Sequence, residues 1–239
     1  MAIKNFVKEQ WKLLTMLLIT GIGITVTAVI FKPNVFTVLP LYNSLIIMAM
    51  SARANRYALI YGGVNSILYA VVNWQFGLPG QAASALLVSF PIQIVTFVLY
   101  HRRKYGNSTL FRKMSWKWRG LALLGFAVCW VCMLAVLELL GSSYAMLDTT
   151  LTLFGFLLPF LTMFAFVEAP FLNIINSAIN TWQYVQMMLD GELARTPFLI
   201  FNVYSLICVV MGAFRQLALY REQRALKKEK EKEVIAEEN

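Results

Sequence analysis

Four amide side chains fall on one side of a membrane-length helix predicted over residues 168–191. They are Asn173, Asn176, Asn180 and Gln183. Drawn at about 100° per residue, they lie within an arc of about 80°. Unpaired amides are costly in hydrocarbon, so the stripe must face other helices, water or a polar solute. Since amides donate and accept hydrogen bonds without carrying charge, the favoured chemistry is reversible binding of a neutral or weakly charged solute.

Other membrane-length stretches carry polar and aromatic side chains that would complete such a site. They are Asn65, Tyr69 and Asn73 in residues 57–75, Gln93 in residues 82–100, and Asn202 in residues 197–220. Rings beside amides suit a ring-bearing polyol, because rings stack and amides bind hydroxyls. Trp182 is a further candidate, but it lies about 180° from Asn173 and fits packing against a neighbouring bundle or lipid equally well. For every amide the alternative is an interhelical hydrogen bond, worth about 1 kcal/mol.

Ionisable residues are missing from the middle of these stretches. Charged groups at membrane depth would mark ion coupling or a proton relay, so no ion-driven pump is predicted. An intramembrane enzyme is not expected, since the spans hold no His/Asp pair, HExxH motif or Ser-Lys dyad. Cys129 and Cys132 form a C-x-x-C without a second pair or a nearby His, which predicts no metal site. These two and Cys208 are expected to be buried packing residues, and no cofactor is expected.

The composition predicts an all-α integral membrane protein. Of the 239 residues 59% are hydrophobic and 14% are charged, whereas a soluble domain carries about 25% charged residues. Eight transmembrane helices are predicted, over residues 13–31, 35–52, 57–75, 82–100, 120–140, 149–167, 168–191 and 197–220. The first run is too long for the core of a signal peptide and lacks a clear cleavage site, so an uncleaved helix is expected.

The positive charge of the chain, +9 overall, is concentrated in the loops on one side. With a cytoplasmic amino terminus, all 21 Lys and Arg residues except Lys32 and Arg195 fall on the cytoplasmic side, and both termini lie there. The most basic loop, residues 101–119, would allow nucleic-acid binding, but contact with anionic lipid explains it better. We therefore expect membrane lipid, and no nucleic acid, as the partner of these charges.

An internal repeat with an offset of 111 residues relates the two halves. Asn65-Ser66 precedes Gly80 by the same 15 residues that separate Asn176-Ser177 from Gly191. The offset superposes spans two to four on spans six to eight, and span five is left as a connector. Parallel repeats of this kind occur in transporters that hold the solute at the repeat interface.

The predicted domains follow from this repeat. They are an extra amino-terminal helix (1–33), a first three-helix bundle (34–101), a basic loop with a linker helix (102–141), a second three-helix bundle (142–220) and a charged cytoplasmic tail (221–239).

Several stretches resemble the PnuC family of vitamin transporters, typified by nicotinamide riboside uptake. They are YALIYGGVNSILYAVVNWQFGLPGQAASALLVSFPIQIVTFVLYHR, KMSWKWR, DTTLTLFGF and VEAPFLNIINSAINTWQYV. Within them, Gly62-Gly63-Val64-Asn65 is similar to the family's Gly-x-x-Asn, Pro91-Ile92-Gln93 to its Pro-x-Gln element, and Glu168 to its Glu before span seven.

The resemblance implies a SWEET-like 3+1+3 arrangement behind an extra helix, in a homotrimer in the bacterial cytoplasmic (inner) membrane. It also implies facilitated diffusion of nicotinamide riboside, which a cytoplasmic kinase traps by phosphorylation. The sequence departs from the family where a W-x-x-W is usual, since those positions hold Pro170 and Asn173. Another nucleoside or vitamin, such as a deoxynucleoside, thiamine or riboflavin, therefore stays an alternative substrate. A polytopic scaffold or receptor is a more distant alternative.

Overall fold

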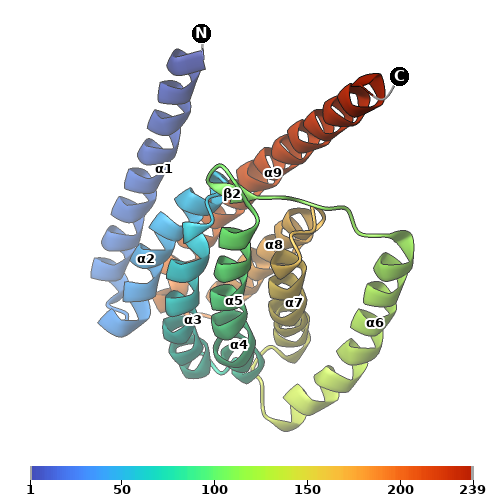
Figure 1. Ribbon diagram of the computed structural model, residues 1–239. Coiled ribbons are helices and arrows are strands. Elements are labelled where there is room, and N and C mark those ends of the chain that lie inside the picture. The colour runs from blue at the N-terminus through green and yellow to red at the C-terminus, as the bar shows by residue number, and fades with distance from the viewer. Residues whose placement is uncertain (1, 238–239) are drawn as a thin grey trace.

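The computed structural model describes residues 2–237 and is almost entirely helical (Figure 1). The helices are α1 (Ala2–Phe31), α2 (Val35–Ala52), α3 (Tyr57–Gln75), α4 (Pro79–Ser84), α5 (Phe90–Arg102), α6 (Trp116–Leu139), α7 (Ala145–Met163), α8 (Ala169–Leu189) and α9 (Thr196–Glu237). A π-helical turn, η1 (Ala85–Ser89), joins α4 to α5, and a 3₁₀ turn, η2 (Leu193–Arg195), precedes α9. Each of the eight predicted spans overlaps one of these helices or the α4–α5 segment, and the sixth, 149–167, extends past the end of α7 at Met163. Met1 and the last two residues of the predicted tail, 238 and 239, lie outside the described residues.

Five helical segments are long and apolar enough to cross a membrane, judged by length and composition. They are Leu13–Phe31, Pro79–Arg102, Trp116–Leu139, Ala145–Met163 and Leu193–Glu229. A sixth apolar helix, Phe36–Ala52, is shorter. The helices α3 and α8 fall outside this set because their amide side chains lower their hydropathy. The multi-pass membrane character follows from the other helices, whereas α3 and α8 need polar surroundings.

The fourth span begins earlier than predicted, at Pro79. Proline suits the first turn of a helix, where its missing N–H would have no partner. The π turn lies directly ahead of Pro91. A widened turn accommodates the proline ring, which would otherwise collide with the carbonyl of the preceding helical turn.

The basic loop contains a small hairpin that the sequence did not predict. Strand β1 (Lys104–Tyr105) pairs with antiparallel β2 (Ser108–Thr109). Gly106 turns the chain at a φ of 53°, a conformation that glycine adopts without steric cost. The hairpin places Ser108 and Thr109 in buried positions at one end of the helices.

Six helices form a closed ring. In order, α2 packs on α3, α3 on α5, α5 on α7, α7 on α8, α8 on α9, and α9 on α2. The helices approach closely through small residues, as is common between membrane helices. A Cβ atom on Gly62 would lie 2.4 Å from Gln93 Oε1, and one on Gly155 would lie 2.7 Å from Ser84 Oγ. At these seams the glycines leave room for the polar side chains of Gln93 and Ser84.

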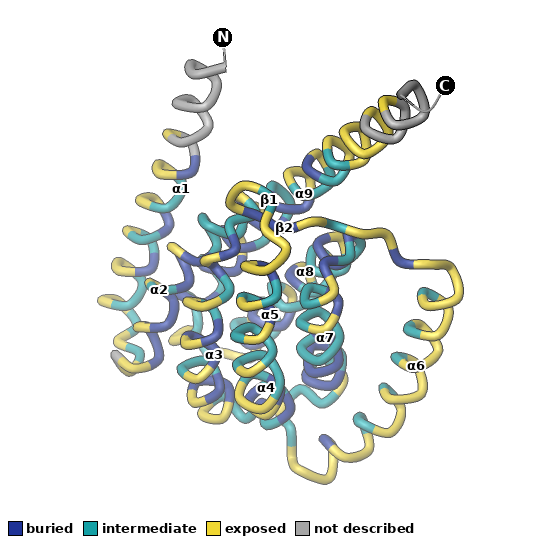
Figure 2. Tube along the Cα trace, viewed as in Figure 1, coloured by how far each residue is buried: buried dark blue, intermediate teal, exposed yellow. Residues whose placement is uncertain are grey.

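Two helices lie outside this ring. Helix α1 packs on α9 and α2, and α6 packs on α7 at the edge of the molecule (Figure 1). Most of α6 is exposed (Figure 2), and Leu137 is its buried residue. Cys129 and Cys132 are exposed on this helix, so the prediction that all three cysteines are buried was wrong for these two and holds for Cys208. The reason is that α6 offers only one side to a neighbour.

The backbone repeats the 111-residue offset. The turn after α2 contains Ala54 at a φ of 52°, and the turn after α7 contains Ala165 at a φ of 57°. The N–H of Ala54 donates to Ser51 O at 2.9 Å, and that of Ala165 donates to Thr162 O at 2.8 Å. Alanine rarely adopts a positive φ, so the coincidence supports two related helix pairs, α2–α3 and α7–α8.

Candidate functional site

The ring encloses a cavity of about 490 Å³ that is lined from α2, α3, the α4–α5 segment, α7, α8 and α9. This volume lies within the range of small-molecule sites. The lining runs from Ser108 and Phe111 near the hairpin to Gln81 and Tyr184 toward the other end. Apart from Arg56, the described residues that line the cavity carry no charge.

Most of the candidate residues predicted from the sequence meet in this cavity. Its lining includes Asn65, Tyr69, Asn73, Gln93, Asn173, Asn176, Asn180 and Asn202. Four helices that are far apart in the sequence contribute these side chains. The geometry therefore supports a polar path through the ring, as the stripes suggested.

Two candidates lie elsewhere. Gln183 is fully buried and stands next to the lining residue Gln81, whose Nε2 donates to Gln183 Oε1 at 3.1 Å. Trp182 is 53% exposed and is not among the residues that line the cavity. Trp182 lies on the opposite side of α8 from the amide stripe. Its position therefore favours the alternative that it packs against lipid or a neighbouring protein.

On the α3 side the amide of Asn65 is engaged by the protein itself. Asn65 Nδ2 donates to Ser44 Oγ at 2.6 Å and to Pro40 O at 3.4 Å, and Asn65 Oδ1 accepts from Asn43 Nδ2 at 3.1 Å. Ser44 Oγ in turn donates to the hydroxyl of Tyr69 at 3.1 Å. Asn65 thus holds α2 against α3 and has little capacity left for a solute.

The α8 side keeps its hydrogen-bonding capacity. Within the described part of the chain, the side chains of Asn173 and Asn176 have no hydrogen-bond partner, and both line the cavity. Asn180 Nδ2 donates to Asn202 Oδ1 at 3.0 Å, and Asn202 Nδ2 donates to Phe198 O at 2.8 Å. Asn180 Oδ1 is left as a buried acceptor without a partner. Buried polar atoms are normally paired, so this wall is suited to a ligand with donor groups.

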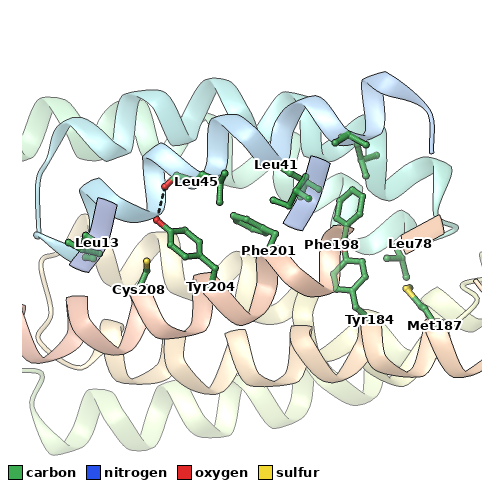
Figure 3. Close-up of a cluster of buried hydrophobic side chains, with 14 residues drawn as sticks. Leu13, Leu41, Leu45, Leu78, Tyr184, Met187, Phe198, Phe201, Tyr204 and Cys208 are labelled. Carbon is green, nitrogen blue, oxygen red and sulfur yellow. Dashed lines mark hydrogen bonds between the residues drawn. The ribbon is translucent and has the colours of Figure 1, made fainter. Parts of the chain in front are cut away.

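Aromatic rings pack together toward the end of the ring away from the hairpin, where Tyr184 lines the cavity. Tyr184 and Phe198 stack with ring centroids 5.4 Å apart (Figure 3). Phe76 meets Phe198 edge-on at 5.1 Å. The Arg195 guanidinium lies 4.2 Å above the centroid of Phe76. Since Phe76 follows the end of α3 and Arg56 precedes its start, the aromatic cluster and the hairpin lie at opposite ends of the ring.

A buried carboxylate fixes the aromatic end. Asp148, predicted to lie in a loop, belongs to the first turn of α7 and is fully buried. Its oxygens accept hydrogen bonds from the N–H groups of Gly80 and Gln81, at 3.3 and 3.1 Å, and from Ser142 Oγ at 2.9 Å. A carboxylate stabilises a helix N-terminus in this way. Asp148 therefore orients the start of α4, and with it the cavity residue Gln81.

The hairpin is tied to α9 at the other end. The N–H of Phe111 donates to Gln223 Oε1, and Gln223 Nε2 donates to Thr109 O, both at 2.9 Å. Tyr105 donates to Glu222 Oε1 at 2.8 Å, and this hydrogen bond raises the pKa of Tyr105. The hairpin thus joins the end of α5 to α9 beside the cavity.

The segment between β2 and α6 is fixed to the start of α8. Glu168 pairs with Arg119 and accepts from the N–H of Met114 at 3.2 Å. The Arg119 guanidinium also lies 4.7 Å from the centroid of the Trp116 ring. Glu168 therefore anchors the entry to α6 rather than facing the cavity.

Sequence reasoning missed three residues that shape the site: Ser44, Arg56 and Gln81. Arg56 was counted only as a loop charge, and Gln81 was placed in an outer turn. For Gln81 the available signal was Pro79, which marks the first turn of a helix. The sequence offers no comparable signal that Arg56 is buried.

Comparisons with known proteins agree with this architecture. The sequence matches the profile of a family described as nicotinamide mononucleotide transporter over residues 34–218. Among solved structures, the fold is similar to one described as "Crystal structure of the Vitamin B3 transporter PnuC", with a TM-score of 0.71 and 18% sequence identity over 88% of this chain and 90% of that one. No curated protein matches the sequence significantly.

Proposed function

The chain belongs to the nicotinamide mononucleotide transporter family, and on that premise we propose that it carries nicotinamide riboside across the membrane by facilitated diffusion. The family and fold are those of a multi-pass membrane transporter for a vitamin-type small molecule, not of an enzyme. The observation that carries the proposal is the unused hydrogen-bonding capacity of Asn173, Asn176 and Asn180 on a cavity of about 490 Å³.

The chemistry of nicotinamide riboside suits this wall. Its ribose hydroxyls and carboxamide nitrogen donate hydrogen bonds, and its carboxamide oxygen accepts one. The amides of Asn173 and Asn176 do both, while Asn180 Oδ1 accepts. Tyr69 and Tyr184 also line the cavity and offer ring surfaces. A site of this kind rejects poorly matched solutes because its own buried groups are then left unpaired.

Facilitated diffusion fits the charges of the cavity. Carboxylates and histidine are absent from its described lining, and the nearby Asp148 is engaged in capping α4. Transport would then follow the substrate gradient, and phosphorylation by a cytoplasmic kinase would keep the product inside. Because nicotinamide riboside is a pyridinium cation, the membrane potential is held at zero in this test. We then expect imposed sodium or proton gradients to leave the final level of uptake into liposomes unchanged; accumulation above the outside concentration under either gradient would contradict this.

The same proposal includes topology and assembly. Eight spans in a 3+1+3 arrangement behind an extra helix, with both termini cytoplasmic in a bacterial inner membrane, account for the basic loops and for the matched turns at Ala54 and Ala165. A homotrimer accords with the broad apolar surface of α6. Light scattering of the purified protein, corrected for detergent, would give the mass of the assembly.

A second candidate is another nucleoside or vitamin of similar size. Pro170 and Asn173 line the cavity at the positions where the family resemblance leads one to expect tryptophans, and the described lining contains no tryptophan. A ring would then stack on tyrosine or phenylalanine instead. This observation favours a deoxynucleoside, thiamine or riboflavin over nicotinamide riboside if the lost tryptophans set the specificity.

A binding titration separates the candidates. The purified full chain would be titrated with nicotinamide riboside, thiamine, riboflavin and deoxynucleosides, and labelled ligands that bind would be tested for uptake into liposomes. We expect nicotinamide riboside to bind most tightly. Binding of none of the four classes would contradict the transporter proposal in this form, and tighter binding of another class would replace the substrate.

A further inference from the structure

The segment that follows α5, residues 104–112, connects two helices from opposite sides of the ring. It begins at the end of α5, and it reaches α9 through hydrogen bonds to the side chains of Glu222 and Gln223 (Figure 1). In the ring order, α7 and α8 separate α5 from α9 on one side, and α3 and α2 separate them on the other. The segment, called the strap below, therefore crosses the hairpin end of the ring.

The strap is also attached to both of the matched turns. Before α3, the N–H of Arg56 donates to Asn107 O at 3.0 Å. Before α8, the N–H of Arg112 donates to Ala165 O, and that of Val167 donates to Arg112 O, both at 3.0 Å. Residues 104–112 thus contact the two helix pairs as well as α9.

One side of the strap faces the cavity. Ser108 and Phe111 are among the lining residues, and Ser108 and Thr109 are buried although they belong to a short hairpin. Polar residues of a surface loop are normally exposed. The strap is therefore packed over the end of the ring.

The attachments differ in how easily they can break. Those to the two turns join backbone to backbone, so breaking them requires movement of the backbone. Those to α9 use the exposed side chain of Glu222 and the half-buried side chain of Gln223, which can rotate away and bond to water. Each such hydrogen bond shifts an equilibrium by only about 2- to 13-fold. The contact with α9 is thus the one best suited to open.

We propose that the strap closes the hairpin end of the transport path, and that Glu222 and Gln223 are positioning residues that latch it to α9. Gln216, two turns before Gln223 on α9, lines the cavity, so a gap between the strap and α9 leads into it. The inference rests on the proposed function in taking the cavity as the transport path. Both latch residues lie beyond residues 34–218, the part of the chain that the family profile matches.

The latch is tested by labelling a cysteine inside the cavity. Ser89 lines the cavity midway along the α4–α5 segment. The full chain with Ser89→Cys is placed in liposomes of known protein orientation, a membrane-impermeant maleimide is added on one side, and mass spectrometry reports the modified position. Gln223→Leu removes two hydrogen bonds to the strap, so we expect the labelling rate from the hairpin side to rise by roughly 5- to 50-fold.

The side from which labelling occurs separates a latch from a structural role. Gln223→Leu should leave the labelling rate of Ser89→Cys from the opposite side unchanged. An unchanged rate from the hairpin side overturns the proposal. An equal rise from both sides also overturns it, because it would show that the whole ring has loosened.

Two glutamates on α9 provide a matched pair. Glu222 accepts from the hydroxyl of Tyr105 at 2.8 Å, whereas Glu229 is an exposed glutamate two turns further along the same helix. Glu222→Ala should raise the labelling rate from the hairpin side by about 2- to 10-fold. Glu229→Ala should leave it unchanged. Equal rates for the two variants contradict the latch.

A crosslink covers the case in which a latch variant does not fold. Tyr105→Cys and Glu222→Cys are joined by a cleavable bismaleimide in a chain with Cys129→Ser and Cys132→Ser. Uptake of nicotinamide riboside should fall by roughly tenfold or more and return after cleavage, and normal uptake by the crosslinked protein overturns the strap. If nicotinamide riboside is not carried, the proposed function fails, and labelling of Ser89→Cys in the crosslinked protein still decides the strap: labelling from the hairpin side should stop, and an unchanged rate contradicts the proposal.

Discussion

Helices α3 and α8 correspond at the 111-residue offset and lie on opposite sides of the ring, yet the amides at the matched position are used differently. Asn65 on α3 makes three hydrogen bonds to α2. Its counterpart at the 111-residue offset, Asn176 on α8, lines the cavity and has no hydrogen-bond partner in the described structure. The comparison teaches that the same residue type at the same repeat position stabilises the assembly on one side and is available to a solute on the other.

The neighbouring helices explain the difference. Helix α2 supplies Asn43 and Ser44 to Asn65, whereas the same offset on α7 brings Phe154 and Gly155. Neither of these side chains can accept or donate a hydrogen bond. Gly155 instead lets Ser84 approach closely. The two helix pairs therefore share a turn conformation at the 111-residue offset and differ in the polar partners that they offer.

The largest effect is expected for Asn65→Leu, a variant of similar shape. Leucine leaves Asn43, Ser44 and the Pro40 carbonyl without their partner, so the free energy of unfolding should fall by about 2–4 kcal/mol. Thermal unfolding of the purified variant measures the loss, with solute affinity measured on the folded fraction. On sequence grounds alone this variant was expected to weaken binding, but the contacts of Asn65 now predict nearly unchanged affinity. A normal melting temperature with weakened binding would reverse the assignment of the two sides.

Asn176→Leu is expected to give the opposite result. It removes a side chain without protein partners, so the melting temperature should stay close to that of the wild type. Solute affinity should fall by about 5- to 30-fold, which corresponds to about 1–2 kcal/mol for a lost hydrogen bond. Titration and thermal unfolding on the same sample separate the two quantities. Early melting with normal binding would show that α8, like α3, serves assembly.

Asn202→Leu, a change on the neighbouring helix α9, sharpens the comparison on the α8 side of the cavity. Asn202 Oδ1 accepts a hydrogen bond from Asn180 Nδ2. This contact fixes the orientation of the Asn180 amide and leaves its Oδ1 without a partner. Without Asn202 the Asn180 amide is free to rotate, and we expect affinity and stability each to fall by about 1 kcal/mol. The double variant Asn180→Leu with Asn202→Leu should lose little more affinity than Asn180→Leu alone. Fully additive losses would contradict this coupling.

The smallest effect is expected for changes at the two matched turns, which test whether the turns are equivalent. Ala54→Gly and Ala165→Gly relieve a positive φ at matched turns, and each should raise the free energy of unfolding by about 0.5–1 kcal/mol after the entropic cost of glycine is included. Equal gains, measured by thermal unfolding, would show that the turns are equivalent. A gain at only one position would show that the repeats differ in backbone strain as well as in side chains.

The sequence by itself determined the membrane class, the helices and many of the residues that line the cavity. Hydropathy and the spacing of the amides on α3 and α8 are local properties of the chain, and eight of the ten predicted site residues line the cavity. The 111-residue offset, read from Asn65 and Asn176, reappears in the turns at Ala54 and Ala165. These features are readable because helix periodicity fixes which residues share a face.

Only the tertiary structure decided which amides are free and which are paired. Whether Asn65 or Asn176 has a partner depends on the residues that α2 and α7 bring against them, and no periodicity within one helix contains that information. The exposure of Trp182 and of Cys129, and the burial of Arg56 and Asp148, are decided in the same way. Burial depends on the packing of other elements, such as the hairpin over Arg56 and the start of α4 over Asp148.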